Sequence, residues 1–448
     1  MVSLQCRSSL FSKVLPSLNP PQRFGYTLAV NLGASSPRGT VEFDIPELDT
    51  KHKPLTQDTF LALQPHEAVT PKHYTQGIAL AAKTYLHNPE VEKALTSLPQ
   101  AKQTLEHLVL FVPGPVTPQN HVTTISNLKL QNVDLNTVGE HLAHHLKHPK
   151  PIPVTAANDM VAPALSYVAK QLKDPTFQQW LKENPHRSHR ASIAMTGGGY
   201  GVIHANLNPF PFGTTDKTPT HTFEILPSEQ GHLRANEHEL VLEQSGASVA
   251  SLIQNYCERL GLKPEDKLTQ TLVALGNGKL VTQYPIRTKN PEEIKALEAT
   301  ACFNIAHDTK TQETLATLKN VSLDTHLKAQ TFAIDTYVDA LSRAVQGHAL
   351  GGMNHFIVGG PLAGGIRQAV KAAERPFQKH SFETLIEQTL MRYTDTAGFQ
   401  KMAQQDLKVS YEPFKNVLEG ASLLPQAIRT KDNSFILPVH PKTNEATP

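Results

Sequence analysis

Residues 192–207 of this 448-residue chain read SIAMTGGGYGVIHANL, in which two apolar runs flank a glycine-rich segment. Apolar runs of this length bounded by glycine predict two strands joined by a tight turn. A glycine turn after a buried strand also lets backbone N–H groups approach a phosphate, because no Cβ stands in the way. Most single turns of this kind serve only the fold, so the interpretation depends on the rest of the chain.

Two further segments combine a short apolar strand with glycine. Residues 26–31 (YTLAVN) precede a Gly/Ser turn at residues 33–36, and residues 355–358 precede a glycine pair at 359–360 with a helix from residue 364. Strands that alternate with helices favour the α/β class, here as two related α/β domains that face a cleft. Other strands are predicted at residues 40–45, 107–112 and 152–156, and helices at residues 73–85, 138–146, 160–172, 247–260, 291–306 and 323–346.

Composition narrows the class of protein. The 42 Lys+Arg nearly balance the 40 Asp+Glu, so no basic face for nucleic acid is indicated. The three cysteines, Cys6, Cys257 and Cys302, lie far apart, which argues against a disulfide scaffold or a cysteine zinc site and favours a reducing cytoplasm. No apolar run approaches the ~18 residues that span a bilayer. We therefore expect a cytoplasmic protein with neither nucleic acid nor membrane as a partner.

The two ends of the chain differ from the rest in composition. Residues 1–41 contain no Asp or Glu but four Arg or Lys, with Ser and Pro frequent, which is the composition of a transit peptide. An unstructured leader is the simpler interpretation, and residues 1–23 are predicted to be a disordered leader. Roughly the last 18 residues are polar and proline-containing and read as a tail.

Two further segments carry side chains that could act in chemistry, one after the predicted strand at 152–156 and one after Leu226-Pro227. Asn158-Asp159 comes after residues 152–156, where Asp is an N-cap in most proteins. It is also a carboxylate at the carboxyl end of a strand, where α/β folds place their sites and where it accepts a proton from a hydroxyl. Glu229 and His232 together offer an acceptor and a donor to adjacent hydroxyls of a polyol.

Other signals of chemistry are weak or missing. His141, His144, His145 and His148 share one helix face, and although histidines four apart chelate zinc in some proteins, no nearby acid or cysteine completes a site. A solvated helix face is the preferred interpretation, and no protein ligand to a metal is predicted. The chain has no P-loop, no GxGxxG that opens a helix and no GxSxG elbow.

Taken in chain order, these segments resemble the bacterial glucokinase family, which belongs to the sugar kinase–actin–chaperone superfold. Each motif is loose, and their collinearity carries the resemblance. The segment at residues 417–421 matches the motif that opens the family's C-terminal helix. The segments that match family motifs are residues 31–38, 114–116, 126–128, 158–160, 197–202, 226–232, 357–360 and 417–421. The branch of sugar kinases and repressors with a cysteine zinc site is disfavoured, because those cysteines are missing.

The resemblance implies an α/β fold with two ribonuclease-H-like domains, of the actin and hexokinase type, that flank a central cleft. Residues 24–165 together with 405–448 would form the small domain, and residues 166–404 the large domain. The family often forms dimers, so a homodimer is also implied.

The resemblance implies ATP-dependent phosphorylation of a hexose, glucose to glucose 6-phosphate, with Asp159 as the general base. Mg²⁺ would be held mainly through phosphates and water. The sugar would be bound by Asn127, Asn158, Asp159, Glu229, His232 and Glu243, the last of which precedes its Ser-Gly at a spacing that differs from the family's. ATP would be bound by Asn31, Gly33, Ser35, Ser36, Gly197, Gly198, Gly199, Gly359 and Gly360.

The chain departs from the family pattern on the nucleotide side. Asn31 stands where the family has an Asp that orients hydrated Mg²⁺, and Gly198 stands where it has a Thr. Loss of a charge-assisted bond costs ~1.5–3 kcal/mol, or roughly 10- to 100-fold in rate. Two alternatives therefore stay open: a sugar-binding sensor on the same fold with weakened catalysis, and a kinase for another hexose such as an N-acetylhexosamine.

Overall fold

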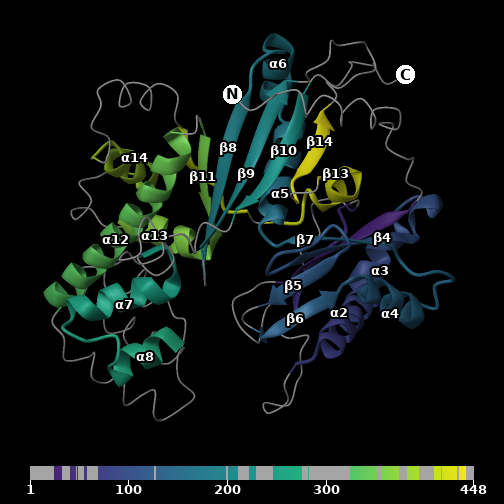
Figure 1. Ribbon diagram of the computed structural model, residues 1–448, viewed down its shortest axis with the longest axis horizontal. Coiled ribbons are helices and arrows are strands. Elements are labelled where there is room, and N and C mark those ends of the chain that lie inside the picture. Colours follow the sequence, from purple (N-terminus) through teal and green to yellow (C-terminus); the bar gives the residue numbers. More distant parts are fainter. Residues whose placement is uncertain are drawn as a thin grey trace.

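The computed structural model contains a five-stranded and a seven-stranded β-sheet with helices packed on them (Figure 1). A separate hairpin, β5(His121–Ile125) and β6(Leu130–Asp134), completes the strands of the N-terminal half. The structure describes residues 25–32, 41–46, 48, 55–57, 69–125, 128–197, 200–209, 221–228, 246–274, 281, 323–350, 353, 355–372, 381–392, 408–414, 416–430 and 433–439.

The five-stranded sheet has the order β3-β2-β1-β4-β7. Its strands are β1(Tyr26–Leu32), β2(Val41–Asp44), β3(Leu55–Gln57), β4(Leu105–Val112) and β7(Val154–Asn158). β1, β2 and β3 are antiparallel to one another, whereas β1, β4 and β7 run parallel. The continuous apolar runs predicted β1 and β4 correctly, because both faces of a parallel strand are covered.

The seven-stranded sheet repeats this topology. Its strands are β8(His189–Thr196), β9(Tyr200–Pro209), β10(His221–Ser228), β11(His355–Gly359), β12(Lys408–Tyr411), β13(Ile428–Arg429) and β14(Phe435–Val439). β8, β9 and β10 are antiparallel, and β8, β11 and β12 are parallel, in the order β12-β11-β8-β9-β10-β14-β13. Five strands in each sheet thus share one order, which is the duplication expected of two ribonuclease-H-like domains.

Three helices pack with the five-stranded sheet: α2(Pro71–Leu86), α3(Pro89–Thr96) and α4(Asn136–Leu146). α2 and α3 each begin with proline, whose missing N–H is not needed in the first turn. The side chains of Thr70 and Asn88 cap these two helices by accepting a backbone N–H of the first turn. A short 3-10 helix, η2(Gln100–Lys102), leads into β4.

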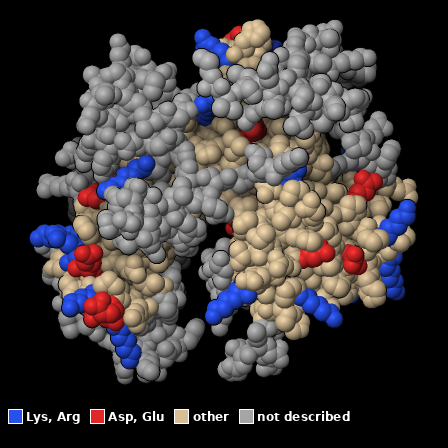
Figure 2. Space-filling view, in the orientation of Figure 1, with Lys and Arg blue, Asp and Glu red and all other residues tan. Residues whose placement is uncertain are grey.

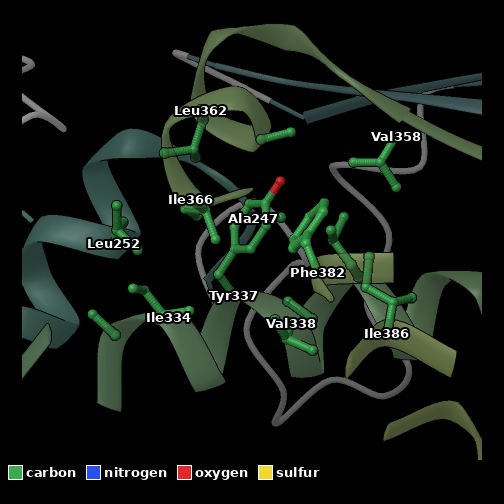
Figure 3. Close-up of a cluster of buried hydrophobic side chains, with 14 of the residues drawn as sticks. Ala247, Leu252, Ile334, Tyr337, Val338, Val358, Leu362, Ile366, Phe382 and Ile386 are labelled. Atoms are coloured by element: carbon green, nitrogen blue, oxygen red, sulfur yellow. The ribbon is translucent and has the colours of Figure 1, made fainter. Parts of the chain in front are cut away.

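A separate apolar core lies beneath the seven-stranded sheet. Figure 3 shows Tyr337 of α12(Leu323–Leu350) surrounded by side chains that include Leu362, Ile366 and Phe382. Tyr337 is fully buried and its ring stacks on that of Phe382, with centroids 6.3 Å apart. The helices that contribute to this core are α7(Val249–Arg259), α8(Lys267–Ala274), α12(Leu323–Leu350), α13(Gly360–Ala372) and α14(Phe382–Arg392).

A third core joins the two sheets. It contains side chains of α5(Val161–Lys173), of α6(Pro175–Glu183), of β4 and of β8 and β9. In Figure 1, α5 lies where the two sheets approach each other. The segment before the 3-10 helix η7(Ala421–Gln426) is fastened to α5, because Lys170 and Lys173 bond Glu412 and Glu419 at 2.7 and 2.8 Å. In the space-filling view, a hollow separates the surface over α7 and α8 from the surface over α2 and β6 (Figure 2).

The predicted assignment of residues 405–448 to the small domain is wrong for the strands within it. β12 pairs with β11, and β14 pairs with β10, so both belong to the seven-stranded sheet. The reason is topological: β12 is the last parallel strand of the second repeat, and β14 extends that sheet beyond β10. The rest of the predicted domain division stays a prediction.

Two helices also differ from the predictions, one in type and one in its first residue. The resemblance implies a C-terminal helix at about residue 417, but the chain forms only the 3-10 helix η7, which contains Pro425 and leads into β13. Conversely, α13 begins at Gly360 rather than at residue 364. Its earlier start is favoured by Pro361 in the first turn and by the Thr196 side chain, which accepts a hydrogen bond from Ala363 N at 3.1 Å.

Two sequence predictions lie outside the described residues, the leader at 1–23 and the helix at 291–306. The prediction that roughly the last 18 residues form a tail is wrong for Phe435–Val439, which form β14 of the seven-stranded sheet. The reason is that Phe435, Leu437 and Val439 bury apolar side chains. Cys257 is a free, buried cysteine. Within the described part of the chain, no helix is both long and apolar enough to cross a bilayer.

Histidines gather at the amino ends of two parallel strands of the larger sheet. The His189 and His355 rings lie 5.9 Å apart, and each bonds a hydroxyl, of Tyr167 at 3.1 Å and of Ser410 at 2.8 Å. Burial lowers the pKa of His189, and Lys408 lowers it further. Burial, His189 and Lys408 together lower the pKa of His355 to about 4. Both rings are therefore neutral at pH 7.

We predict that acid destabilises the protein through these rings. The unfolded chain takes up protons near the ordinary histidine pKa, whereas folded His355 takes one up only near pH 4. The contribution of neutral His355 to stability is therefore fully present above about pH 7 and is lost as the pH falls toward 4. His355 alone should lower the free energy of unfolding by about 2–3 kcal/mol between pH 7.5 and pH 4.5. Urea unfolding at the two pH values measures this loss. His355→Gln should flatten the dependence, and an unchanged slope in that variant would refute the assignment.

Candidate functional site

Polar residues lie at one edge of the five-stranded sheet, where three parallel strands end. Asn31 of β1 pairs with Phe111 of β4, and Phe111 in turn pairs with Ala157 of β7. Asn158 and Asp159 therefore lie one strand away from β4 and two strands away from β1, at the same carboxyl edge. Ligand sites of α/β folds form at such edges.

Backbone bonds fix the loop that carries Asp159. Asp159 N donates to Val112 O at 2.9 Å, and Ala162 N donates to Asp159 O at 3.2 Å. The Asn158 side chain donates to Gly114 O at 3.1 Å and accepts from Met160 N at 2.9 Å. Asn158 thus holds the loops after β4 and β7 together, and its role in sugar binding stays a prediction.

Gly114 is required by the backbone at the end of β4. Its φ is +104°, and a Cβ there would overlap the carbonyl oxygen of Thr124 in β5. The hairpin β5–β6 therefore packs directly on this loop. Glycine is the residue that adopts this φ without strain and leaves room for the hairpin.

Tyr74 of α2 lies near the Asp159 carboxylate. Its side chain is almost fully buried, and burial raises the pKa of its phenol far above the usual range, with the negative charge of Asp159 adding to the rise. The phenol is therefore neutral at any physiological pH. No sequence signal pointed to Tyr74, because α2 is separated from Asp159 by two sheet strands and a hairpin along the chain.

In the seven-stranded sheet, the Thr196 hydroxyl contacts the turns that follow β8 and β11. Thr196, the last residue of β8, is fully buried, and its Oγ1 lies 2.8 Å from the Tyr337 hydroxyl. The same Oγ1 accepts from Ala363 N at 3.1 Å and donates to Gly359 O at 3.3 Å. The end of β8, the end of β11, α12 and the first turn of α13 therefore meet at this side chain.

The glycines of these turns differ in what the fold requires of them. A Cβ at Gly359 would lie 2.6 Å from a neighbouring aromatic carbon, and one at Gly360, where φ is +93°, would overlap the Thr196 carbonyl oxygen. Packing alone accounts for these two glycines. At Gly197 the nearest described atom would be Pro361 Cγ at 3.4 Å, an ordinary contact. Packing against the described residues therefore does not require glycine at position 197, and its role in ATP binding stays a prediction.

The loop after β7 lies against the first residues of β9 in the other sheet. A Cβ on Gly201, at the start of β9, would lie 2.5 Å from Met160 Sδ and 2.8 Å from its Cγ. Met160 directly follows Asp159, so the loop with the carboxylate packs against the strand that leaves the glycine turn at residues 197–201. The structure thus brings the predicted base and the predicted second phosphate turn to neighbouring positions.

Of the predicted site residues, the structure describes Asn31, Asn158, Asp159, Gly197, Gly359 and Gly360. The others lie outside the described residues: Asn127, Gly33, Ser35, Ser36, Gly198, Gly199, Glu229, His232 and Glu243. Sequence reasoning missed Tyr74 and Thr196. Thr196 stood within the segment that decided the fold, but its contacts depend on α12 and α13, far along the chain.

The histidines of α4 form no metal site with described residues. The His144 and His145 rings meet edge to face with centroids 6.1 Å apart, and His148 Nδ1 lies 2.7 Å from Lys150 O. Throughout the described ranges, no three His, Cys, Asp or Glu side chains are grouped so that they would hold a metal ion.

Comparison with known proteins identifies a fold but assigns the chain to no family. No protein-family model matches the chain, and no curated protein sequence matches it. Among solved structures, the chain is similar to glucokinase from Balamuthia mandrillaris in complex with glucose, with TM-score 0.52, 13% identity, and 94% of this chain and 98% of that chain covered.

Two further solved structures give lower TM-scores. A ROK family transcriptional regulator, a homolog of the E. coli MLC protein, gives TM-score 0.47 at 14% identity over 90% of this chain and 78% of that chain. A putative sugar kinase from Cytophaga hutchinsonii gives 0.45 at 14% identity over 90% of this chain and 100% of that chain. At these identities only the fold is shown, and the predicted class of two ribonuclease-H-like domains is confirmed.

Proposed function

We propose that this protein is an ATP-dependent hexose kinase that transfers the γ-phosphoryl group to the 6-hydroxyl of glucose. The observation that carries the proposal is the position of Asp159, directly after β7 at the edge shared with Asn31 and beside the glycine turn of the other sheet. A carboxylate next to a strand–glycine turn has what phosphoryl transfer needs: a base beside a phosphate-binding backbone. The similarity to a glucokinase fold supports glucose as the substrate.

In this proposal Asp159 accepts the proton of the sugar hydroxymethyl group as its oxygen attacks phosphorus. Its backbone bonds to β4 and α5 hold the carboxylate in place, which favours a defined attack geometry. Tyr74 stays neutral beside it and adds no second negative charge. Asn127, Glu229 and His232 would read the hydroxyl pattern of the sugar. Closure of the two domains would exclude water and suppress ATP hydrolysis.

The proposal requires ATP and Mg²⁺, and the described residues fit an ion held through phosphates and water. Asn31 Oδ1 is buried at the carboxyl end of β1, and an amide oxygen accepts a hydrogen bond from a metal-bound water. A Cβ at Gly197 would make only ordinary contacts with described residues, and a glycine there is compatible with a phosphate that approaches the backbone after β8. When bound, Mg²⁺ neutralises charge on the transferring phosphoryl group.

A second candidate function rests on Asn31 itself. An amide brings no negative charge to the edge of the sheet, so a chain selected only to bind sugar would tolerate it. In that case the protein is a sugar sensor on a kinase fold, with Asp159 binding a hydroxyl rather than accepting its proton. A kinase for another hexose, such as an N-acetylhexosamine, is a variant of the first proposal.

We predict that Asn31→Asp raises turnover by about 10- to 100-fold, because a carboxylate adds a charge-assisted bond worth ~1.5–3 kcal/mol. Initial rates at saturating Mg-ATP and sugar measure the effect. Asn88→Asp is the matched control, since Asn88 caps α3 on the surface and Asp caps equally well. Equal rates for Asn31→Asp and wild type would mean that the ion is oriented by other groups.

The proposal is tested by ADP formation from Mg-ATP with glucose, mannose, fructose, galactose and N-acetylglucosamine, each compared with no sugar. Stimulation by glucose supports a glucokinase. Stimulation by another sugar keeps the class and changes the substrate. A folded protein that binds glucose but forms no sugar-dependent ADP would be a sensor, and the kinase proposal would fail.

A further inference from the structure

Strand β7, which carries the proposed base, is an edge strand among the described residues. It pairs with β4 on one side, from Leu108↔Val154 to Val112↔Asn158. An edge strand is held by half as many ladder bonds as a central strand, so its position depends on what bonds the other side. Asp159 follows this strand directly, and any shift of β7 moves its carboxylate.

Two side chains bond the outer side of β7. Asn120 accepts from Ala156 N at 3.0 Å and donates to Val154 O at 2.9 Å, so its amide group takes the place of a neighbouring strand. Arg429 Nη1 donates to Ala156 O at 3.2 Å. The second guanidinium nitrogen, Nη2, donates to Val116 O at 2.6 Å, in the loop after β4.

Arg429 belongs to the other sheet. It lies in β13, where it pairs with Phe435 of β14, and β14 pairs with β10 of the seven-stranded sheet. Its guanidinium also lies over the Phe435 ring, 5.2 Å from the centroid. Arg429 therefore reaches from the last strands of one sheet to the strand and loop that frame Asp159 in the other.

The charge of Arg429 is unusual. In the part of the chain that the structure describes, no carboxylate forms an ion pair with it, and its contacts are two carbonyl oxygens and a ring face. Burial lowers the pKa of the guanidinium to about 10, so it remains charged at pH 7. A half-buried cation without a carboxylate is costly, so stability alone is a poor explanation for it.

We propose that Arg429 is a positioning residue for Asp159, which holds β7 and the loop after β4 at a fixed separation from the seven-stranded sheet. The two segments it joins are the same two that Asn158 joins at Gly114. Movement of β13 and β14 is thereby transmitted to the strand three residues before the base. The inference rests on the proposed kinase function for its catalytic part, whereas its effect on β7 does not.

The test compares Arg429→Gln, Arg429→Lys and Arg367→Gln with wild type. Arg367 is the matched control, because it also stacks on a ring, Tyr411, and bonds Glu383 at 2.9 Å, but it makes no described contact with the five-stranded sheet. For Arg429→Gln we expect kcat to fall roughly 100-fold, as for a misplacement of about 1 Å, with KM for the sugar changed by less than about 3-fold. Arg429→Lys should recover part of the loss, and Arg367→Gln should match wild type.

Hydrogen exchange of residues 154–162 is the second measurement, and it does not depend on turnover. In Arg429→Gln these amides should exchange at least about 10-fold faster, while those of β8 and β11 stay unchanged. Wild-type kcat in Arg429→Gln, or exchange that is unchanged or uniformly faster, would overturn the inference and leave the kinase proposal standing. If wild type shows no sugar-dependent turnover, the kinase proposal fails, and the exchange result alone decides whether Arg429 holds β7.

Discussion

Asp159→Asn should lower kcat by about 10²- to 10⁴-fold while sugar affinity stays within a few-fold of wild type. The amide keeps the shape of the side chain but cannot take up the proton that the attacking hydroxyl releases. The bonds that fix this loop, Asp159 N to Val112 O and Ala162 N to Asp159 O, involve only backbone atoms, so the fold should be kept. ADP formation under saturating glucose and Mg-ATP, together with calorimetric glucose binding, measures both quantities.

Asp174→Asn is the control for this variant. Asp174 caps α6 by accepting from Thr176 N at 2.8 Å, and Asn is as good a cap, so this change should leave kcat and stability unaltered. If Asp159→Asn turned over at the wild-type rate, the carboxylate would not be the base. If it lost glucose binding as well as turnover, the defect would be in the site's structure, and the assignment would be unsupported.

Gly360→Ala should be the most destabilising small substitution in the seven-stranded half. The φ of Gly360 is +93°, and the added Cβ would overlap the carbonyl oxygen of Thr196, a backbone atom in the centre of the sheet. Neither β8 nor the start of α13 can move aside, because the Thr196 hydroxyl is bonded to Ala363 N and lies against Tyr337. We expect a loss of about 3–5 kcal/mol in the free energy of unfolding, which is more than most single substitutions cost.

Gly261→Ala separates the two causes. Gly261 also has a positive φ, +83°, but a Cβ there would meet no atom within 4 Å. Its cost should be only that of the backbone conformation, about 1 kcal/mol. Urea unfolding of both variants gives the difference, which measures the clash. Equal losses at the two positions would mean that the β8–α13 contact is looser than described.

The sequence predicted the strands best where burial on both faces leaves a continuous apolar run, as in residues 26–31 and 107–112. It also predicted Asp159 as a site residue, because a carboxylate directly after such a strand is visible from local sequence. The duplicated strand order could only be implied through the family resemblance. It depends on pairings between segments hundreds of residues apart, such as β8 with β11, which no local pattern encodes.

What the sequence could not predict is which distant segments meet. Residues 435–439 were predicted to lie in a tail, because the short apolar run FILPV stands among polar residues, and nothing local indicates that it pairs with β10. No sequence signal singled out Arg429, which bonds carbonyl oxygens of β7 and of the loop after β4. No sequence signal singled out Asn120 either, because its amide bonds the backbone of β7 only where β7 is the edge strand.

The most direct test of the central claim is the position of the phosphate in the product. Protein, glucose and Mg-ATP are incubated together, and the product is followed by phosphorus NMR with proton coupling. The account predicts a sugar phosphomonoester coupled to the two protons on carbon 6, formed at the rate of ADP and absent with Asp159→Asn. Inorganic phosphate as the only new product, or no product from a folded protein that binds glucose, would contradict it.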